Sequence, residues 1–125
     1  MIEGIGIDVV NIDRIGRLSE AVKQRLFHPR ELEDASALAL EVQSEFLAGR
    51  FAAKEALGKA LGTGLKGISL QEIWVEKQSD GSPKLCFAGR ARILVGSRTV
   101  MLSISHDQPV SVAVVLLQGG CDGSL

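Results

Sequence analysis

The sequence has 125 residues, a hydrophobic fraction of 46% and a formal net charge of −1. This length suits one domain with a real core and excludes two, so we expect a single domain over residues 1–125 with a frayed tail at 118–125. No apolar run reaches the roughly 18 residues of a membrane span and no signal pattern opens the chain, so we expect a cytoplasmic protein with no membrane partner. The two cysteines, Cys86 and Cys121, match neither a disulfide framework nor a zinc spacing, and we expect both to be reduced.

Positive charge is concentrated in one short segment. Between Arg14 and Arg30 the sequence has five cations and one acid, a net charge of +4, so the remainder of the chain carries −5. We expect this basic segment to attract an acidic protein rather than nucleic acid, because Phe27 is its only aromatic residue and a nucleic-acid site normally adds stacking aromatics. The alternative is that these cations only form the solvent-facing side of amphipathic helices and bind no partner.

The first predicted element is a strand over residues 2–10. Gly4, Gly6 and Asp8 alternate there with three branched apolar residues, so one face is apolar and the other exposes backbone beside a carboxylate. Asp8 alone is better explained by a strand end or a helix cap than by a ligand role, which depends on its pairing with Glu55. Helical segments are expected next at residues 11–18, 20–27 and 30–40.

The longest predicted helix covers residues 42–61. It has no proline, is rich in Ala, Leu, Lys and Glu, and is followed by the stop signal Gly62-Thr63-Gly64. Helical periodicity predicts a stripe that faces the core. The residues of this stripe are Val42, Phe46, Gly49, Ala53, Leu57 and Ala60.

The opposite face of this helix carries charged residues at helical spacing. Glu55 and Lys59 lie four residues apart, and the small residues beside them, Ala48, Ala52 and Gly58, would leave room for a ligand. A solvated ion pair that only stabilises the helix is the simplest interpretation. Arg50 and Lys54 on the same helix add two cations around the single carboxylate, an arrangement that suits a metal ion bound together with a polyphosphate.

The second half of the sequence is dominated by strand patterns. Strands are predicted at residues 68–77, 84–87, 100–105 and 110–117, with a hairpin turn at 79–83, a short helix at 88–95 and a turn at 106–109. One strand, then helices, then strands that can pair as antiparallel neighbours predict an α+β fold. In this fold the long helix packs on a mainly antiparallel sheet.

Polar residues near the ends of these elements form the candidate site: Asp8, Glu55, Lys59, Ser105, His106 and Asp107. Two carboxylates from different elements are a typical protein contribution to Mg²⁺, which keeps several waters and takes other ligands from substrate phosphates. A neighbouring lysine then neutralises charge that develops during phosphoryl transfer. His106 could act as acid, base or phosphate donor, although a histidine in a hairpin is often only solvated.

Four segments together resemble the bacterial holo-acyl-carrier-protein synthases, the small class of 4′-phosphopantetheinyl transferases. They are Gly4-Ile-Gly-Ile-Asp8, Arg14, the block from Phe46 to Gly64 that contains Arg-Phe-x-x-Lys-Glu-x-x-x-Lys, and Ser103-Ile-Ser-His106. The resemblance covers almost the whole chain in order and implies the fold of that family. It is weakest between residues 30 and 42, so no role is carried over there.

The resemblance implies a reaction in which coenzyme A donates its phosphopantetheine arm to a serine of an apo acyl carrier protein, leaving adenosine 3′,5′-bisphosphate. Asp8 and Glu55 would bind Mg²⁺, and Lys59 would contact the pyrophosphate. The other residues implied at the coenzyme site are Arg50, Gly62, Pro83, Ser105 and His106. The base for the carrier serine is open between Asp107, acting through a water, and Glu55, acting through the water shell of the metal.

Partners follow from the same resemblance. Arg14 would face the carrier protein, and its neighbours Arg17 and Arg25 in the basic segment extend this expectation. The family also implies a homotrimer with each active site between two subunits.

Two functions of other classes stay open at this point. Gly4-Ile-Gly-Ile-Asp8 also opens ribonuclease-H-like nucleases, in which several acids bind two metals. Against a nuclease, the residues after Asp8 predict helix rather than a hairpin. A trimeric binding module without enzymatic activity is the third possibility, and loss of function on removal of Mg²⁺ would separate it from either enzyme.

Overall fold

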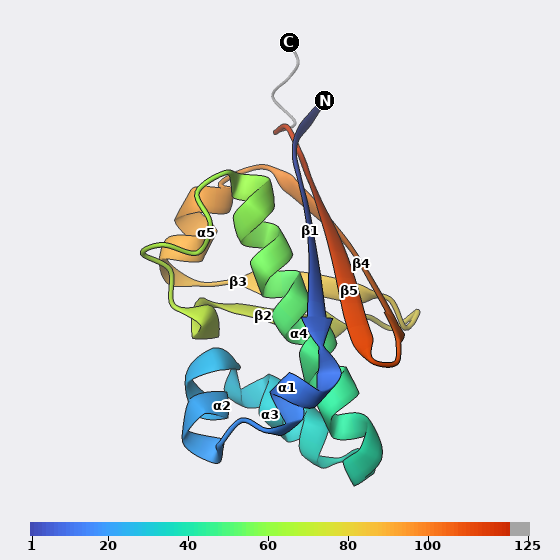
Figure 1. The fold of residues 1–125 in the computed structure, drawn as a ribbon. Coiled ribbons are helices and arrows are strands. Elements are labelled where there is room, and N and C mark those ends of the chain that lie inside the picture. Colours follow the sequence, from blue (N-terminus) through green and yellow to red (C-terminus); the bar gives the residue numbers. More distant parts are fainter. Residues whose placement is uncertain (121–125) are drawn as a thin grey trace.

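The computed structural model describes residues 1–120, so the expectations for Cys121 and for residues 121–125 lie outside the described part of the chain. One long helix, α4, is surrounded by the other elements (Figure 1). The elements in chain order are β1 (Ile2–Asn11), α1 (Ile12–Gly16), α2 (Glu20–Leu26), α3 (Pro29–Ser36), α4 (Leu40–Leu61), the 3₁₀ turn η1 (Leu70–Glu72), β2 (Ile73–Lys77), β3 (Pro83–Phe87), α5 (Gly89–Val95), β4 (Thr99–Asp107) and β5 (Val110–Gln118). The predicted α+β fold with a long helix and antiparallel strands is confirmed.

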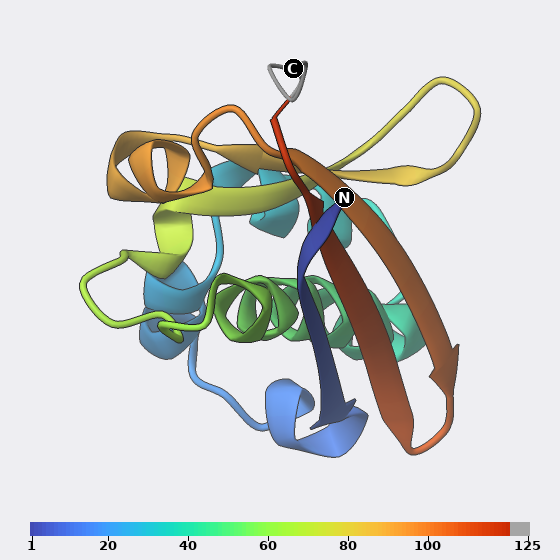
Figure 2. The same cartoon turned by 90° about the horizontal axis from the view of Figure 1, so that it is seen from above.

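Two antiparallel sheets lie on different sides of α4. The larger sheet has the strand order β1-β5-β4, and β2 and β3 form a separate hairpin. Figure 2 shows α4 between this hairpin and β1. The prediction of a frayed tail from residue 118 is wrong at its start, because Gln118 pairs with both Ile2 and Thr99, and the Gly119 N–H donates to the Met1 carbonyl at 2.8 Å.

The glycine face of β1 is covered by α4 rather than exposed. A Cβ at Gly6 would lie 1.9 Å from the Ala56 carbonyl oxygen, and one at Gly4 would lie 2.1 Å from that of Ala60. Any larger residue would therefore push the strand away from the helix. This close approach sets the distance between β1 and the residues of α4 that follow Ala56.

The predicted core stripe of α4 is only partly correct. Ala53, Leu57 and Ala60 are buried, whereas Val42 near the start of the helix is 37% exposed. The small residues expected to leave room for a ligand, Ala48, Ala52 and Gly58, are themselves buried by the chain's own elements. Periodicity missed this because α4 is covered on several sides over most of its length, with β1, β5 and α1 among its partners.

A buried ion pair connects α4 to four other parts of the fold. Lys54 and Glu31 are both fully buried, and Lys54 Nζ lies 2.6 Å from Glu31 Oε1. Lys54 also donates to the carbonyls of Leu26, at 2.8 Å, and Leu70, at 3.1 Å. The other carboxylate oxygen, Glu31 Oε2, accepts from the Val75 N–H at 3.0 Å. Burial lowers the pKa of Lys54, and the Glu31 charge and hydrogen bond oppose this shift.

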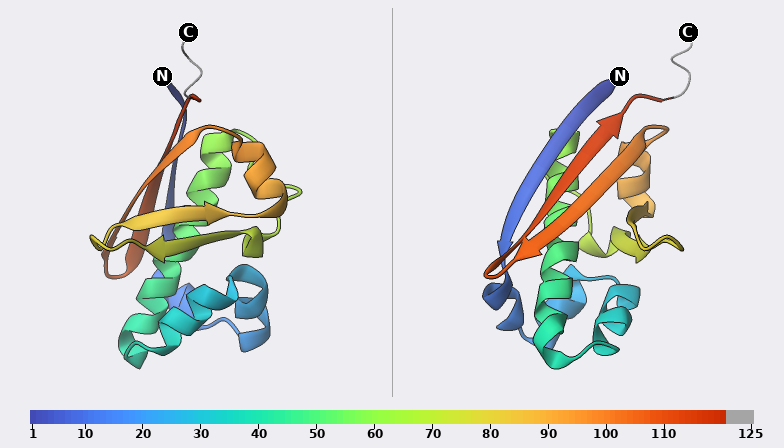
Figure 3. Two further views of the ribbon diagram at one scale, coloured as in Figure 1. Left: turned by 180° about the vertical axis from the view of Figure 1, so that it is seen from behind. Right: turned by 90° about the vertical axis from the view of Figure 1, so that its right-hand side faces the viewer.

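The outer face of the three-stranded sheet is apolar, and Figure 3 shows no other element in front of it. On β1, Ile5 is 65%, Ile7 54% and Val9 58% exposed, and Met101 on β4 is 45% exposed. The pairing register places Ile5, Leu116 and Met101 in one row across the three strands. Within residues 1–120, no helix has the length and apolar character needed to cross a bilayer.

We predict that Glu31→Gln lowers the free energy of unfolding by about 3–5 kcal/mol, because it leaves the Lys54 ammonium buried without its counter-ion. Urea unfolding monitored by circular dichroism measures this change. Lys23→Ala is the control, since Lys23 makes only a 3.9 Å contact with the exposed Glu20 and should lose less than about 1 kcal/mol.

The double variant Glu31→Leu with Lys54→Met removes both charges, and we expect it to recover much of the loss. If Glu31→Gln unfolds at the same urea concentration as the parent, the pair does not stabilise the fold.

Candidate active site

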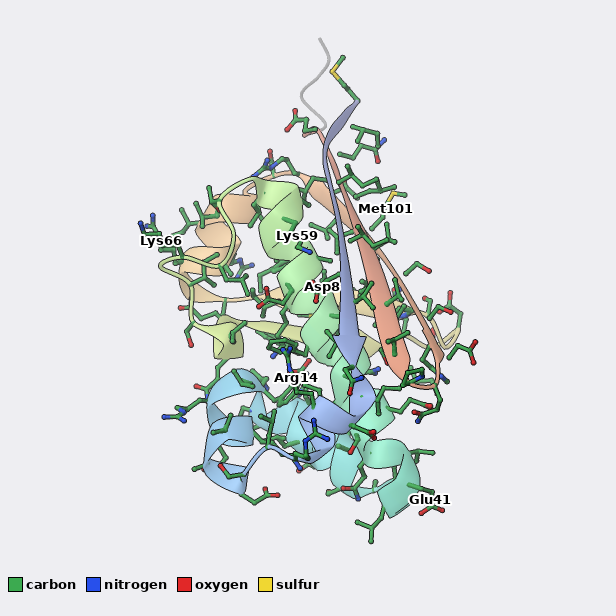
Figure 4. The ribbon with its side chains drawn as sticks, in the orientation of Figure 1. Asp8, Arg14, Glu41, Lys59, Lys66 and Met101 are labelled. Carbon is green, nitrogen blue, oxygen red and sulfur yellow. The ribbon has the colours of Figure 1, made fainter. Side chains whose placement is uncertain are left out.

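The structure places Lys59 in contact with Asp8, and the charge of Asp8 also acts on Glu55. Asp8 is the seventh residue of β1 and Glu55 lies in the second half of α4. Lys59, one turn after Glu55, reaches back to β1, where its Nζ lies 3.0 Å from Asp8 Oδ1 and 2.9 Å from the Ile7 carbonyl oxygen. The side chain of Asp8 is 17% exposed and that of Lys59 is 54% exposed. Figure 4 shows Lys59 and Asp8 next to each other at the junction of strand and helix.

The electrostatics of Glu55 support this grouping. Burial is the largest cause that raises its pKa, and the charge of Asp8 raises it further. The positive charges of Lys59 and Arg14 act in the opposite direction. Two carboxylates that repel each other at a half-buried position form a site at which a cation would be stabilised.

Within residues 1–120, no group of three or more His, Cys, Asp or Glu side chains is arranged to hold a metal ion. A cation between Asp8 and Glu55 would therefore take its other ligands from water or from a bound molecule. This donor set of two hard oxygen ligands fits Mg²⁺, which binds through one or two carboxylates plus substrate phosphates.

Lys54 does not belong to this group, contrary to the expectation of three cations around Glu55. Its ammonium is fully buried against Glu31 and two backbone carbonyls. The spacing misled because Lys54 and Glu55 are neighbours in sequence and point about 100° apart around the helix. Lys59 and, at longer range, Arg14 are the cations that act on Glu55.

A second part of the predicted site surrounds a hollow between the first half of α4 and the end of β4. It has a volume of about 240 Å³, and its walls include Phe46, Arg50, Ile104 and His106. The Arg50 guanidinium lies over the Phe46 ring, 3.6 Å from its centroid. Predicted residues from opposite halves of the sequence, Arg50 and His106, are thus brought to one hollow.

Arg50 also borders a larger hollow of about 580 Å³ on the side of α3, whose walls include Arg30, Asp34 and Glu76. The Arg50 Nε is buried and has no hydrogen-bond partner within the described chain. Burial lowers the pKa of Arg50, and the charges of Glu31 and Asp34 oppose this. An unpaired donor of a cationic group at the border of two hollows is well suited to bind an anion.

The remaining predicted site residues are more scattered. Gly62 caps the C-terminus of α4 with φ +80°, a backbone conformation that favours glycine. Pro83 begins β3 in the separate hairpin and lines neither hollow. Ser105 and Asp107 are exposed on β4, where they alternate with His106 and therefore point to the other face of the sheet. A single chain therefore does not bring all the predicted site residues together in one place.

The three arginines predicted to bind a partner are exposed, and they are close to one another in sequence. Arg14 lies in α1, Arg17 caps the C-terminus of α1, and Arg25 is in the last turn of α2. Figure 4 shows Arg14 below the Asp8–Lys59 contact, on α1, the helix that follows β1. The basic segment therefore begins directly beside the carboxylate site.

Two acidic residues that matter here were not predicted. Glu31 pairs with Lys54, and Glu45 lies 3.3 Å from His106, measured from Oε2 to Nδ1. Glu45 had a detectable signal, because it lies three residues after Val42 and four before Gly49, on the predicted core stripe. An acid on a core stripe indicates a polar partner from another element. Glu31 had no such signal.

Comparisons with known proteins agree with the resemblance described above. Residues 4–113 match the model of the ACPS family, described as the 4′-phosphopantetheinyl transferase superfamily. The chain is 43% identical over 122 residues to the holo-[acyl-carrier-protein] synthase of Geobacillus kaustophilus, covering 94% of this chain and 90% of that one. It is 39% identical over 124 residues to the synthase of Treponema pallidum, covering 95% and 98%.

Solved structures give the same result for the fold. A holo-(acyl-carrier-protein) synthase from Bacillus anthracis, solved in complex with CoA (3′,5′-ADP), superposes with a TM-score of 0.84 at 38% identity and covers 96% of this chain and 99% of that one. Helix follows β1 directly, and no β1–β2 hairpin of the nuclease type forms. The family match, the identity to synthases over nearly full length and the shared fold lead to one conclusion: the chain belongs to the 4′-phosphopantetheinyl transferase superfamily.

Proposed function

We propose that this chain transfers the 4′-phosphopantetheine arm of coenzyme A to a serine of apo acyl carrier protein and releases adenosine 3′,5′-bisphosphate. The observation that carries the proposal is the cluster of Asp8, Glu55 and Lys59, in which two carboxylates and one ammonium meet at the junction of β1 and α4. The holo-(acyl-carrier-protein) synthase from Bacillus anthracis, which has the same fold, was solved in complex with CoA (3′,5′-ADP). Together these support both the substrate and the type of reaction.

Asp8 and Glu55 are the proposed ligands of Mg²⁺. When bound, the ion would polarise the pyrophosphate and stabilise charge on its oxygens. Lys59 contributes a flexible point charge beside these carboxylates, suited to a phosphate oxygen that becomes more negative in the transition state. The serine oxygen attacks the phosphorus attached to pantetheine, and the bond to the bisphosphate breaks. The acceptor of the serine proton stays open between Asp107, acting through a water, and Glu55, acting through a water of the proposed metal site.

Arg50 and His106 are proposed to bind the adenosine end of coenzyme A. They share one hollow, and the unpaired Nε of Arg50 offers a charged donor to a phosphate. Gly62, Pro83 and Ser105 complete the proposed coenzyme-binding set. Since Pro83 lines neither hollow and Ser105 lies on the opposite face of β4 from His106, this set is best satisfied if a second copy contributes part of it.

We predict that the intact protein, given coenzyme A and Mg²⁺, adds one phosphopantetheine group to an apo acyl carrier protein. Asp8→Asn and Glu55→Gln should each lower turnover on the order of a hundredfold, because each removes a carboxylate charge from the proposed metal site. Mass spectrometry of the carrier protein over time measures this change.

Stability provides the control for these two variants. Each substitution relieves the repulsion between Asp8 and Glu55 and also weakens an attraction to Lys59, so the two effects oppose each other and thermal unfolding should change by no more than a few degrees. Turnover close to that of the parent protein at saturating Mg²⁺ in either variant would refute the metal assignment. A parent protein that leaves the carrier unmodified would refute the proposed reaction itself.

The oligomeric state is proposed to be a homotrimer with active sites shared between subunits. The resemblance to the synthase family suggests it, and the uncovered apolar face of the three-stranded sheet gives it a physical basis, because several exposed β-branched residues lie there in register. A neighbour on this face could bring its own Arg50 or His106 toward the coenzyme.

We predict that Ile5→Glu dissociates the oligomer, since it places a charge in the centre of this apolar face, where Ile5 is 65% exposed in the single chain. Sedimentation velocity measures the change. Ile93→Glu is the matched control, because Ile93 is 75% exposed on α5, away from the sheet face. A parent protein that sediments as a monomer and is fully active at nanomolar concentration would contradict the proposal.

The basic segment from Arg14 to Arg30 is proposed to dock the acidic carrier protein. Arg14, Arg17 and Arg25 are exposed, and none of them is in an ion pair of the described chain. Arg14 is close enough for its charge to act on Glu55, so a carrier protein bound there would have its serine beside the proposed metal site. Nucleic acid is not expected at this surface, for the reasons given by its composition.

We predict that the double variant Arg14→Glu with Arg25→Glu raises KM for the carrier protein on the order of tenfold and leaves KM for coenzyme A unchanged. The parent should lose carrier affinity more steeply with salt than the variant. Steady-state kinetics at several salt concentrations measure both effects.

Arg92→Glu is the matched control, because Arg92 is an exposed cation on α5, outside the basic segment. Equal carrier kinetics for parent and double variant across the salt series would show that the docking surface lies elsewhere.

A further inference from the structure

We propose that Glu45 is a positioning residue that fixes the imidazole of His106 at the coenzyme site, an inference that rests on the proposed function. Nothing in the resemblance or the comparisons assigns a role to Glu45. The two residues come from different elements, α4 and β4, and both line the hollow of about 240 Å³ that also contains Arg50. The contact between them therefore forms part of the wall of the proposed coenzyme site.

The geometry shows which nitrogen of the His106 ring faces the Glu45 carboxylate. Glu45 Oε2 lies 3.3 Å from His106 Nδ1. The carboxylate is the better buried partner, with 22% of the Glu45 side chain exposed against 54% for His106. The facing carboxylate favours a proton on Nδ1, which leaves Nε2, the more distant nitrogen of the ring, free for a ligand. A hydrogen bond to one nitrogen of a histidine fixes both the tautomer and the ring orientation.

The backbone around Glu45 is anchored to the same hairpin. The hydroxyl of Ser111 donates to the Glu45 carbonyl at 3.4 Å, and Ser111 is fully buried and paired with His106 across β4 and β5. One turn further along α4, a Cβ at Gly49 would lie 3.0 Å from Ile104 Cγ2, so helix and strand approach closely here. Glu45 is therefore held at a fixed distance from His106 by contacts that do not involve its own side chain.

A direct role of Glu45 in binding coenzyme A is disfavoured by charge. A carboxylate repels phosphate, and Arg50 and His106 are the residues of this hollow that can attract one. Glu45 instead lies behind His106 as an acceptor. Its expected effect is on the affinity for the coenzyme, through the orientation of the histidine, and its removal should have little effect on the carrier protein.

Steady-state kinetics of four proteins test this inference: the parent, Glu45→Ala, Glu45→Gln and the control Glu41→Ala. We expect Glu45→Ala to raise KM for coenzyme A about tenfold with kcat and carrier KM within about twofold. Glu45→Gln should recover to within about threefold, because the amide oxygen still accepts from Nδ1. Glu41 is an exposed acid in the first turn of α4 that lines neither hollow, and its removal should have no effect.

A double-mutant cycle with His106→Ala separates positioning from general destabilisation. If Glu45 acts through His106, Glu45→Ala should add almost nothing to KM for coenzyme A once His106 is absent. A full additional tenfold effect in that background, or a normal KM in Glu45→Ala alone, overturns the inference. His106→Ala with unchanged coenzyme KM would overturn both the assignment of His106 and the role of Glu45.

A spectroscopic measurement tests the positioning role of Glu45 independently of enzymatic activity. In ¹⁵N-labelled protein at pH 8, the His106 ring of the parent should show the tautomer protonated at Nδ1, and Glu45→Ala should shift it toward the tautomer protonated at Nε2. The same tautomer in both proteins would overturn the positioning role. If the parent fails to modify any carrier protein but shows this shift, the positioning stands and the proposed reaction is what fails.

Discussion

The buried ion pair between Lys54 and Glu31 is the interaction on which the arrangement of this protein depends. It is fully enclosed, and the Lys54 ammonium is shared among a carboxylate and two backbone carbonyls, so the helical N-terminal third, α4 and the β2–β3 hairpin meet at one point. Such a pair gains little net stability over an apolar contact but tolerates very few alternative arrangements. Because Glu55 follows Lys54 directly, the pair also fixes the rotation of α4 that directs Glu55 toward β1.

The site is assembled from two contacts of very different kinds. On the side of β1, glycines let the strand lie almost directly on the helix backbone, which brings Asp8 within reach of Lys59. On the side of β4, a hollow remains between helix and strand, and polar side chains line it. α4 thus presents a compact, charged region near its C-terminal end and an open region nearer its N-terminal end. This division suits the proposed coenzyme, in which a pyrophosphate joins the nucleotide to the pantetheine arm: the charged region would face the pyrophosphate and the hollow would receive the nucleotide.

The sequence was informative wherever a local pattern has a single structural meaning. Alternation located β1 and β4, and an uninterrupted helical composition located α4, so Asp8, Glu55 and Lys59 could be grouped before the structure was known. Contacts between segments that are distant in sequence could not be predicted from such local patterns. Glu31 lies 23 residues before Lys54, and nothing in the spacing of either residue indicates the other. Only the position of Glu45 on an apolar stripe gave a usable signal.

The pairing of β1 with β5 has a consequence for the order in which the molecule can form. Ile2 pairs with Gln118 and Asp8 with Ala113, so this ladder joins residues from opposite ends of the described chain. Contacts of such long sequence separation close a large loop, which costs entropy and slows folding. During synthesis β1 emerges well before β5, the strand with which it pairs. Asp8 therefore reaches its final position only when β5, more than a hundred residues later in the sequence, is in place.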